Sequence, residues 1–416
     1  MIWNEEAFRE GFYDRERDHM KSRRLAWGGT MLVAAVAATL WAAPVLVADR
    51  LNPTLPEPTM SVPEPAATLH ESLLVVDLHT DALLWDRDLL SRGRIGHVDV
   101  PRLIEGRVAV QLFTAVTQVP RGMNLEENDA DSDLITPLAL IQLWPPDTWR
   151  SLLARALHQA DKLRDFASAS QGRLTVVTNR DELTAFLRMR DGDEGTVAAV
   201  LGIEGAHALE GELTNVDTLF AAGYRMIGLT HFFDNAVGGS AHGVRKGGLT
   251  ALGERVLDRM AELGMMVDLA HASEALFDDV TSRARRPIVV SHTGVDGTCP
   301  GPRNLSDDQL MRIAGTGGVV GIGLWPDAVC GETPGDWGRA VRYAADLVGV
   351  DHVALGSDWD GAVPAIVAAA DTEHLTAALL DEGFSSADIR AILGENTLRV
   401  LLATLPAAPP PRRRSR

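Results

Sequence analysis

Histidines and carboxylates follow short apolar runs at several separate places in this sequence. Each of these side chains lies at or directly after the end of its run: His79, Asp81, Glu204, His231, His271, His292 and Asp358. A single histidine in such a place is more often a hydrogen-bonded core or loop residue than a metal ligand. Four histidines and three carboxylates in equivalent places favour a metal centre, because imidazole and carboxylate together suit zinc.

The spacing of these residues indicates how two metal ions would be shared. His79 and Asp81 lie two apart at a strand end, so their side chains point the same way and can bind one ion together. His271 and His292 follow neighbouring runs and can bind a second ion. A pair of ions about 3.5–4 Å apart needs a bridging anion besides water. No lysine ends a run, so a modified lysine is not available and Glu204 is the expected bridge.

The elements that must position these residues alternate between apolar runs and helical patterns. Runs typical of buried strands cover 73–79, 108–114, 197–203, 225–231, 265–271, 287–292, 318–324 and 352–358. Helical patterns fall between them, for example at 151–169, 251–263, 337–348 and 371–382. Eight such units in one domain predict a closed (β/α)₈ barrel with its active site at the carboxyl ends of the strands. The segment 117–196 is too long for one crossover, and we expect extra helices and a short strand at 174–178 there.

Six motifs carry a resemblance to a known family. DLHTD, GIEGAH, LTHFFDN, DLAHAS, VVSHTG with PRN downstream, and LGSDWDG are similar in order and spacing to the motifs of the membrane dipeptidase family. The resemblance covers residues 70–405. It implies a (β/α)₈ barrel of the amidohydrolase type that binds two zinc ions and cleaves dipeptides, with D-residues accepted at the C-terminal side. The metal ligands that it implies are those assigned above.

The same resemblance implies roles for further residues. His231 would contact the substrate or stabilise the developing oxyanion, and Asp358 would lie beside a bridging water and act as general acid and base. Arg303 would grip the free carboxylate of the substrate with its bidentate fork, the alternative being that it only ties down its own loop. Cys299 and Cys330 lie near positions where family members carry a disulfide.

The N-terminal region predicts a membrane anchor. Residues 25–48 carry no charge over 24 positions, which is enough for a helix to cross a hydrocarbon core of roughly 30 Å. A cleaved signal peptide is the competing interpretation. Basic residues directly before the run favour a cytoplasmic segment 1–24 and a catalytic domain in the periplasm or outside the cell. In that oxidising compartment a disulfide between the two cysteines is expected.

The segments that flank the expected barrel are rich in proline. Five prolines in 51–66 favour an extended, semi-rigid stalk within a linker of residues 49–69. We expect a disordered basic tail over 406–416. Unlike the family members that carry a C-terminal lipid anchor, this chain lacks an apolar C-terminal stretch.

Charge and local composition set limits on the partners. The net charge is −18, which argues against a nucleic acid partner, because a phosphate backbone selects for basic surfaces. Small dipeptides are the expected substrates, and a homodimer is compatible with the sequence. We expect the acidic segment 118–133 to shape the substrate mouth, and Ser240 or His242 to line the pocket.

Two other functions remain open at the level of sequence. A related barrel hydrolase with two metal ions could act on a lactone, an ester or a cyclic amide. A metal-free binding scaffold could keep the barrel without the chemistry, but burying an unused cluster of polar side chains is costly. A panel of substrates and an elemental analysis discriminate between these possibilities.

Overall fold

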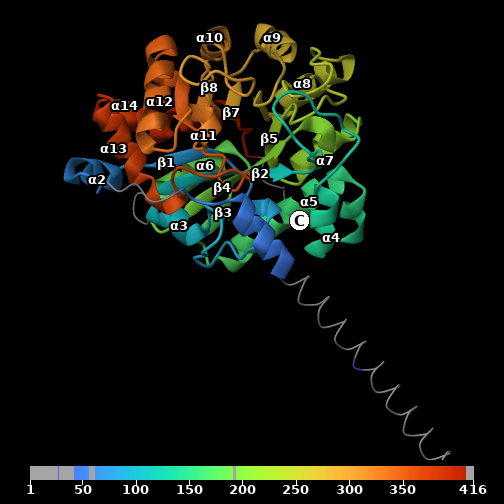
Figure 1. Ribbon diagram of the computed structural model, residues 1–416, viewed down its shortest axis with the longest axis horizontal. Coiled ribbons are helices and arrows are strands. Elements are labelled where there is room, and N and C mark those ends of the chain that lie inside the picture. The colour runs from blue at the N-terminus through green and yellow to red at the C-terminus, as the bar shows by residue number, and fades with distance from the viewer. Residues whose placement is uncertain (1–26, 28–41, 56–60, 191–193, 409–416) are drawn as a thin grey trace, which may run out of the picture.

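A closed parallel barrel forms the centre of the molecule (Figure 1). The computed structural model describes residues 27, 42–55, 61–190 and 194–408. All strand pairs are parallel, in the order β2-β1-β9-β8-β7-β6-β5-β4, and a further pairing of β2 with β4 closes the ring. The strands are β1 (Val75–Thr80), β2 (Val108–Val116), β3 (Leu174–Val176), β4 (Val197–Glu204), β5 (Tyr224–Gly228), β6 (Met266–Asp268), β7 (Val289–Thr293), β8 (Val319–Ile322) and β9 (Val353–Leu355).

The eight expected strands are confirmed, and β3 is the expected short ninth strand. It pairs with the first residues of β4, on the same side of β4 where β5 pairs with later residues. β3 therefore extends the barrel wall but is not one of the eight strands that close the ring. Four strands end earlier than expected: the runs 225–231, 265–271, 318–324 and 352–358 leave the ladder at Gly228, Asp268, Ile322 and Leu355. The residues that follow bend into the mouth of the barrel.

Helices surround the barrel in the way that the alternating pattern predicts. They are α2 (Glu64–Glu71), α3 (Val100–Glu105), α4 (Ile135–Ile141), α5 (Leu152–Ala169), α6 (Arg180–Arg190), α7 (Thr214–Ala221), α8 (Ala251–Leu263), α9 (Glu274–Arg283), α10 (Asp307–Gly315), α11 (Pro326–Val329), α12 (Pro334–Val348), α13 (Glu373–Asp381), α14 (Ser386–Arg390) and α15 (Asn396–Thr404). The long segment 117–196 holds α4, α5, β3 and α6, as expected. Side-chain caps mark several starts, for example Thr250 before α8 and the capping box at Ser306 before α10.

Alternate residues of the strands enter two different apolar layers. One layer lies between the strands and the outer helices and contains Val75 and Leu201. The other contains Val76 and Leu78 of β1 with Val400, Leu401 and Leu405 at the C-terminal end of the chain. The second layer fills the barrel below the mouth, so the polar residues at the strand ends rest on an apolar floor.

The expected linker differs from the structure where residues are described. Residues 42–51 are helical, and Ala48 packs into an apolar cluster with Trp85, Ile135 and Leu138. Helix α2 begins at Glu64 with Pro65 in its first turn, a position where the missing proline N–H costs nothing. Within the described part of the expected stalk, Pro53 follows this docked helix and is paired with the barrel domain, and Pro63 and Pro65 lie at the start of α2. Residues 56–60 lie outside the described residues.

Most of the predicted membrane span lies outside the described residues, as do the segment 1–24 and the tail after Ala408. Within the part of the chain that the structure describes, no helix combines the length and the apolar character needed to cross a bilayer.

Candidate metal centre

The barrel brings the predicted ligands together at the carboxyl ends of its strands. His79 lies in β1, Glu204 ends β4 and His292 lies in β7. Asp81, His231, His271 and Asp358 lie in the loops that follow β1, β5, β6 and β9. The possible ligand atoms form three overlapping groups, each within 4.8 Å: His79 with Glu204 and His292, Glu204 with His231 and His271, and His79 with Asp81 and Asp358.

Glu204 joins the groups through its two carboxylate oxygens. Its Oε1 lies 2.9 Å from Nε2 of His271 and 3.2 Å from Nε2 of His292. Its Oε2 lies 3.2 Å from Nε2 of His231 and 4.0 Å from Nε2 of His79. The side chain is buried, and each oxygen faces different imidazoles. This is the arrangement that a carboxylate bridging two cations would need.

The β1 side of the centre is richer in carboxylates. Nε2 of His79 lies 3.4 Å from Oδ1 of Asp81 and 3.9 Å from Oδ1 of Asp358. Thr114 of β2 donates its hydroxyl to Oδ1 of Asp81 at 2.6 Å and so orients that carboxylate. Asp358 and His271 both have left-handed backbones, with φ of 60° and 62°. Such conformations are costly for residues other than glycine, and they turn these side chains out of the strand direction into the mouth.

The hydroxyl of Ser291, which the sequence motifs did not single out, determines which ring nitrogen of His79 and of His292 faces the centre. Oγ of Ser291 donates to Oδ2 of Asp268 at 2.6 Å, which uses its one hydrogen. The same oxygen lies 3.2 Å from Nδ1 of His79 and 2.9 Å from Nδ1 of His292. Both Nδ1 atoms must then donate a hydrogen to this oxygen, and Nε2 is the ring nitrogen that each histidine turns towards the centre. Ser291 directly precedes His292 in the sequence, which is the only signal that could have pointed to it.

Asp77 is a second buried residue that sequence analysis missed. It accepts hydrogen bonds from the backbone and the hydroxyl of Ser357, both at 2.7 Å, and from Gln111. The hydroxyl of Ser357 also lies 2.8 Å from the His79 carbonyl. Burial raises the pKa of Asp77 to about 6, although these hydrogen bonds oppose the shift. Asp77 thus ties the β1 strand end to the residue before Asp358.

Burial dominates the protonation of the centre. It lowers the pKa of His231, His271 and His292 well below the usual value, with nearby Arg303 adding to each shift. It would also lower the pKa of His79, but the charges of Asp81, Glu204 and Asp358 outweigh it and raise that pKa to about 10. Three imidazoles are therefore neutral at physiological pH, the form in which histidine binds metals.

The pKa values of two carboxyl groups in the centre are raised. Burial raises the pKa of Glu204 well above its usual value, and the charge of Asp81 adds to the rise. Burial also raises the pKa of Asp358 to about 7, against the opposing effect of His79. Without a cation, three negative charges in this buried space repel one another, so the donor set fits positive charge.

Arg303 lies beside the ligands and lines a cavity of about 590 Å³. Its Nη2 donates to the His292 carbonyl at 2.7 Å and lies 3.3 Å from Nε2 of His271. The cavity is also lined by His242 and Lys246 and reaches His271. Arg303 therefore borders both the ligand cluster and the space that a small substrate could enter.

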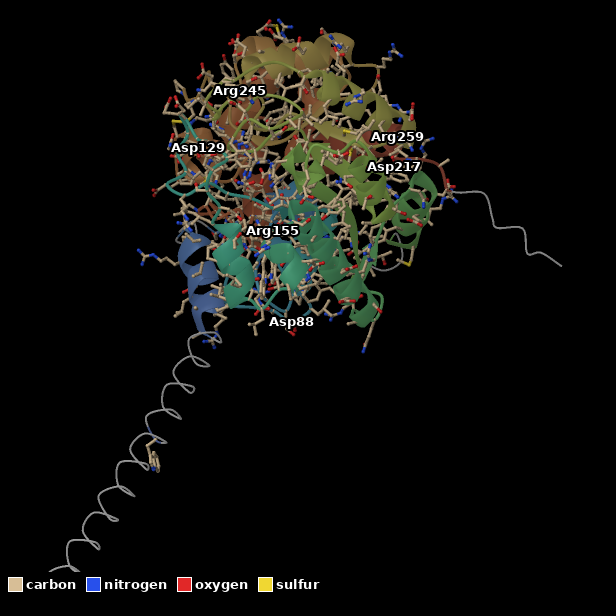
Figure 2. The ribbon with its side chains drawn as sticks, turned by 90° about the vertical axis from the view of Figure 1, so that its right-hand side faces the viewer. Asp88, Asp129, Arg155, Asp217, Arg245 and Arg259 are labelled. Atoms are coloured by element: carbon tan, nitrogen blue, oxygen red, sulfur yellow. A yellow bond between two sulfur atoms is a disulfide. The ribbon has the colours of Figure 1, made fainter. Side chains whose placement is uncertain are left out.

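The acidic segment 118–133 contacts the loop after β5 at His242, which lines the cavity. Asn128 donates its backbone N–H to the His242 carbonyl at 2.7 Å, and Nδ1 of His242 lies 2.8 Å from the Leu125 carbonyl. Figure 2 shows Asp129 and Arg245, which mark these two loops, on the same flank of the molecule. Of the two residues expected to line the pocket, His242 does so, whereas Ser240 is buried and donates to the His231 carbonyl.

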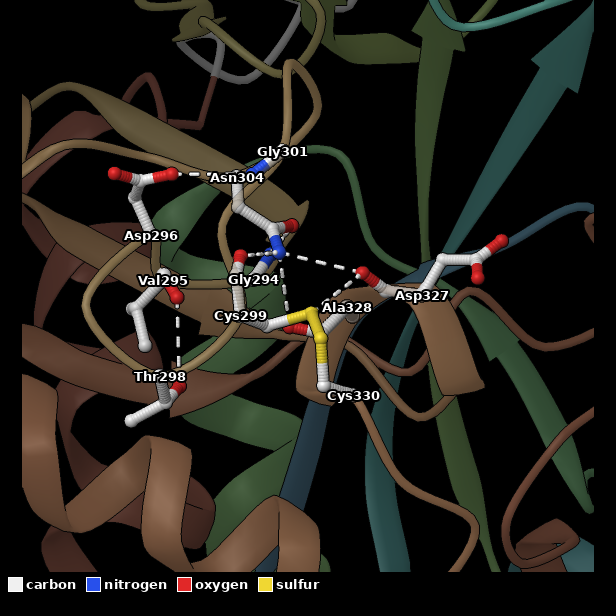
Figure 3. The surroundings of a disulfide bond; sticks show 10 residues. All are labelled: Gly294, Val295, Asp296, Thr298, Cys299, Gly301, Asn304, Asp327, Ala328 and Cys330. Carbon is white, nitrogen blue, oxygen red and sulfur yellow. Dashed lines mark hydrogen bonds between the residues drawn. A yellow bond between two sulfur atoms is a disulfide. The ribbon is translucent and has the colours of Figure 1, made fainter.

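A disulfide connects the loops that follow β7 and β8 (Figure 3). Cys299 and Cys330 form the bond, with 5.2 Å between their Cα atoms. Next to it, Asn304 donates to the carbonyls of Cys299 and Ala328 at 2.7 and 3.2 Å. Because Asn304 follows Arg303, the disulfide and the amide together fix the loop that presents the arginine.

Comparisons with known proteins agree with this arrangement. The chain is 29% identical to a dipeptidase of Clonostachys rogersoniana, over 74% of this chain and 76% of that protein. It is also 29% identical to a dipeptidase of Aspergillus oryzae, over 79% of this chain and 77% of that protein. Among solved structures it is similar to a metallopeptidase of Rhodobacter sphaeroides bound to a phosphinate mimic of the dipeptide L-Ala-D-Ala, with 25% identity and a TM-score of 0.64 over 80% of this chain and 99% of that one.

The comparison with family profiles covers nearly the whole described domain. Residues 64–409 match the profile of membrane dipeptidase, peptidase family M19. The match begins at the first residue of α2 and includes every residue of the ligand cluster. The chain therefore belongs to the membrane dipeptidase family and is a metallo-dipeptidase.

Proposed function

We propose that this chain is a membrane-anchored dipeptidase that holds two zinc ions and accepts a D-residue at the C-terminal side of its substrate. The observation that carries the proposal is the position of Glu204, whose two oxygens face separate sets of imidazoles. A single cation would leave part of this buried polar cluster without a partner, which is costly. A shared carboxylate between two cations satisfies the whole set.

The chemistry of the donors favours zinc. His79 and Asp81 would hold one ion, His271 and His292 the other, and Glu204 would bridge them. These imidazoles present Nε2 to the centre, since Ser291 occupies the Nδ1 atoms of His79 and His292. When bound, the two ions would acidify a water held between them and polarise the peptide carbonyl.

The protein's own groups move the protons and bind the developing charge. Asp358 would accept the proton of the attacking water and return it to the leaving amine. Burial, which raises the pKa of Asp358 to about 7, suits a group that must both take and give a proton near neutral pH. His231, neutral and buried, would donate a hydrogen bond to the tetrahedral oxyanion.

Arg303 would restrict the enzyme to short substrates. Its guanidinium lies between the ligand cluster and the cavity, where it could form a bidentate pair with the free carboxylate of a dipeptide. The Rhodobacter sphaeroides relative was solved with a mimic of L-Ala-D-Ala, which supports acceptance of a D-residue at that end.

The uncharged run 25–48 supports a membrane anchor. Its last residues belong to the helix 42–51, which packs on the domain through Val47 and Ala48. The disulfide between Cys299 and Cys330 suits an oxidising compartment, which agrees with a catalytic domain outside the cytoplasm.

A substrate panel with metal analysis on the same sample tests the proposal. Full-length protein in detergent is assayed against L,L- and L,D-dipeptides, N-acetylated and amidated analogues, and lactones. We expect about two zinc ions per chain and hydrolysis of both dipeptide classes, with C-terminal amides cleaved poorly. Activity on lactones without activity on dipeptides, or less than one tightly bound metal ion per chain after reconstitution, contradicts the proposal.

A further inference from the structure

A segment that contains the end of the predicted membrane span and the residues after it makes direct contacts with the loop that carries Asp358. This N-terminal strap, residues 42–55, lies outside the range 64–409 that matches the family. It is the helix 42–51 followed by a short extended segment, seen in blue below the barrel in Figure 1. The Asp358 loop, residues 358–368, connects β9 with the helices near the C-terminus.

Asn52 joins the strap to the Asp358 loop with both ends of its side-chain amide. Its Nδ2 donates to the Ala48 carbonyl at 2.9 Å and so caps the helix 42–51. Its Oδ1 accepts the backbone N–H of Ala362 at 2.9 Å. The side chain is 3% exposed, so water competes little for either bond.

Backbone pairing continues the contact beyond Asn52. The Leu55 N–H donates to the Ala365 carbonyl at 2.9 Å, and the Ala365 N–H donates to the Pro53 carbonyl at 3.0 Å. Thr54 and Ala365 form an isolated parallel bridge between these two bonds. Three hydrogen bonds from the strap thus hold two points of the Asp358 loop.

The Asp358 loop needs such support because its backbone is strained. Asp358, Asp360 and Ala362 all have left-handed φ values, of 60°, 62° and 61°. Each conformation of this kind costs on the order of 1 kcal/mol for a residue other than glycine. Such strain persists only where neighbouring groups hold the backbone in place.

Asp360 anchors the middle of the same loop from the inside of the domain. Its Oδ1 accepts the His97 N–H at 2.8 Å, its own N–H donates to Nδ1 of His97 at 3.0 Å, and Arg87 pairs with its carboxylate. Its carbonyl accepts from Trp85, whose side chain belongs to the same apolar cluster as Ala48 of the strap. Of the three strained residues, Ala362 is the one whose backbone the strap holds.

We propose that the strap holds the Asp358 loop in its active conformation, and that Asn52 is a positioning residue for catalysis. The inference rests on the role proposed for Asp358 and deepens it: the segment at the end of the proposed anchor would also complete the active site. A shift of the Asp358 carboxylate by a fraction of an ångström would slow proton transfer without changing how Arg303 binds the substrate.

Three variants of the full-length chain, saturated with zinc in detergent, test the inference. Asn52→Ala removes both side-chain bonds. Asn52→Asp keeps an acceptor for the Ala362 N–H but loses the donor to Ala48. Asp49→Ala changes an exposed residue of the same helix and serves as the control. The measurements are kcat and KM for a dipeptide, metal content, and hydrogen exchange of peptides covering 358–368.

In Asn52→Ala we expect kcat to fall by about fivefold, KM to change by less than about twofold, and exchange in 358–368 to rise by about tenfold. Metal content and exchange around Glu204 stay as in the wild type. Asn52→Asp recovers most of kcat and of the protection in the loop, and Asp49→Ala matches the wild type.

If hydrogen exchange in the Asp358 loop is the same in Asn52→Ala as in the wild type, the proposal that the strap holds this loop is wrong. Faster exchange with an unchanged kcat overturns its link to catalysis. If the wild-type chain cleaves no dipeptide, the proposed function fails, while the exchange measurement still decides whether the strap holds the loop, so the two failures are distinguishable.

Discussion

The two ends of the barrel are built on opposite principles. Below the mouth, the interior is filled by side chains such as Val76, Leu112, Met226 and Val289, and α15 closes it with Leu401. These residues are almost completely buried and need no polar partners. The floor therefore stabilises the fold by removing apolar surface from water.

The mouth buries ionisable groups that oppose folding unless a cation is present. Glu204 and Asp358 have raised pKa values because of burial, and His271 and Asp358 have left-handed backbones. Such groups cost stability and are retained where function requires them. The difference between the two ends predicts that substitutions should separate activity from stability, according to the end in which they lie.

The largest effect is expected for Glu204→Gln at the mouth. An amide cannot bridge two cations as a carboxylate does, so we expect kcat/KM to fall by about 10³-fold or more and both metal ions to bind more weakly. The metal-free variant should be about 1 kcal/mol more stable than the metal-free wild type at pH 7, because the cost of burying this carboxyl group, charged or protonated against its ordinary pKa, is removed. Kinetics, metal titration and urea unfolding with a chelator measure the three quantities.

The control for this substitution is Glu212→Gln, which changes an exposed carboxylate in the loop after β4. It should leave activity and stability unchanged. Near-normal turnover in Glu204→Gln would contradict the bridging role, and a less stable metal-free variant would contradict the view that the mouth costs stability.

A substitution in the floor should have the reverse effect and lower stability more than activity. Leu401→Ala truncates a fully buried side chain, and we expect the free energy of unfolding to fall by about 3 kcal/mol. Its kcat, corrected for the folded fraction, should stay within about twofold of the wild type, because Leu401 packs in the apolar floor and not among the ligands. A tenfold loss of kcat in fully folded protein would show that the two ends are coupled.

Much of the mouth could be predicted from the sequence, because parallel strands of a barrel end on one face. His79, Glu204 and His292 lie within or at the end of strands, so their convergence follows from the strand pattern alone. His271 and Asp358 were found by the same rule, although each lies three residues beyond its strand, in a left-handed turn that no apolar pattern reveals.

Contacts between distant residues could not be predicted. Asn52 and Ala362 are 310 positions apart, and proline content alone indicated a stalk where the strap docks. Likewise, the shared hydroxyl of Ser291 depends on the approach of β1 and β7 to within hydrogen-bond distance. Sequence patterns report the direction of one element, whereas these contacts depend on how several elements pack.

A smaller effect within the mouth is expected for Ser291→Ala. The variant keeps all five proposed ligands but releases the Nδ1 atoms of His79 and His292 and leaves Asp268 without one donor. We expect zinc affinity to fall by about 10- to 100-fold, with kcat at saturating zinc reduced much less. Competition with a chromogenic chelator measures the affinity. Wild-type affinity in Ser291→Ala would mean that the histidines are oriented by the backbone alone.

The smallest effect concerns a titratable group outside the mouth, His70 of α2. Burial lowers its pKa to about 4, and its Nδ1 lies 2.8 Å from the hydroxyl of Thr376. Because the folded-state pKa lies below the unfolded value of about 6.5, the unfolded chain binds more protons between these pH values. The stability that neutral His70 contributes is therefore fully present above pH 6.5 and is lost as the pH falls towards 4.

His70→Asn removes this titration, so the stability difference between wild type and variant should shrink by about 2 kcal/mol from pH 7 to pH 4. Urea unfolding of both proteins at matched zinc saturation isolates the effect, because the groups of the mouth titrate alike in both and cancel in the difference. If the stability difference between wild type and variant does not change with pH, His70 does not contribute to the acid sensitivity of the fold. That sensitivity would then come from the groups of the mouth, and the two ends of the barrel would differ more clearly.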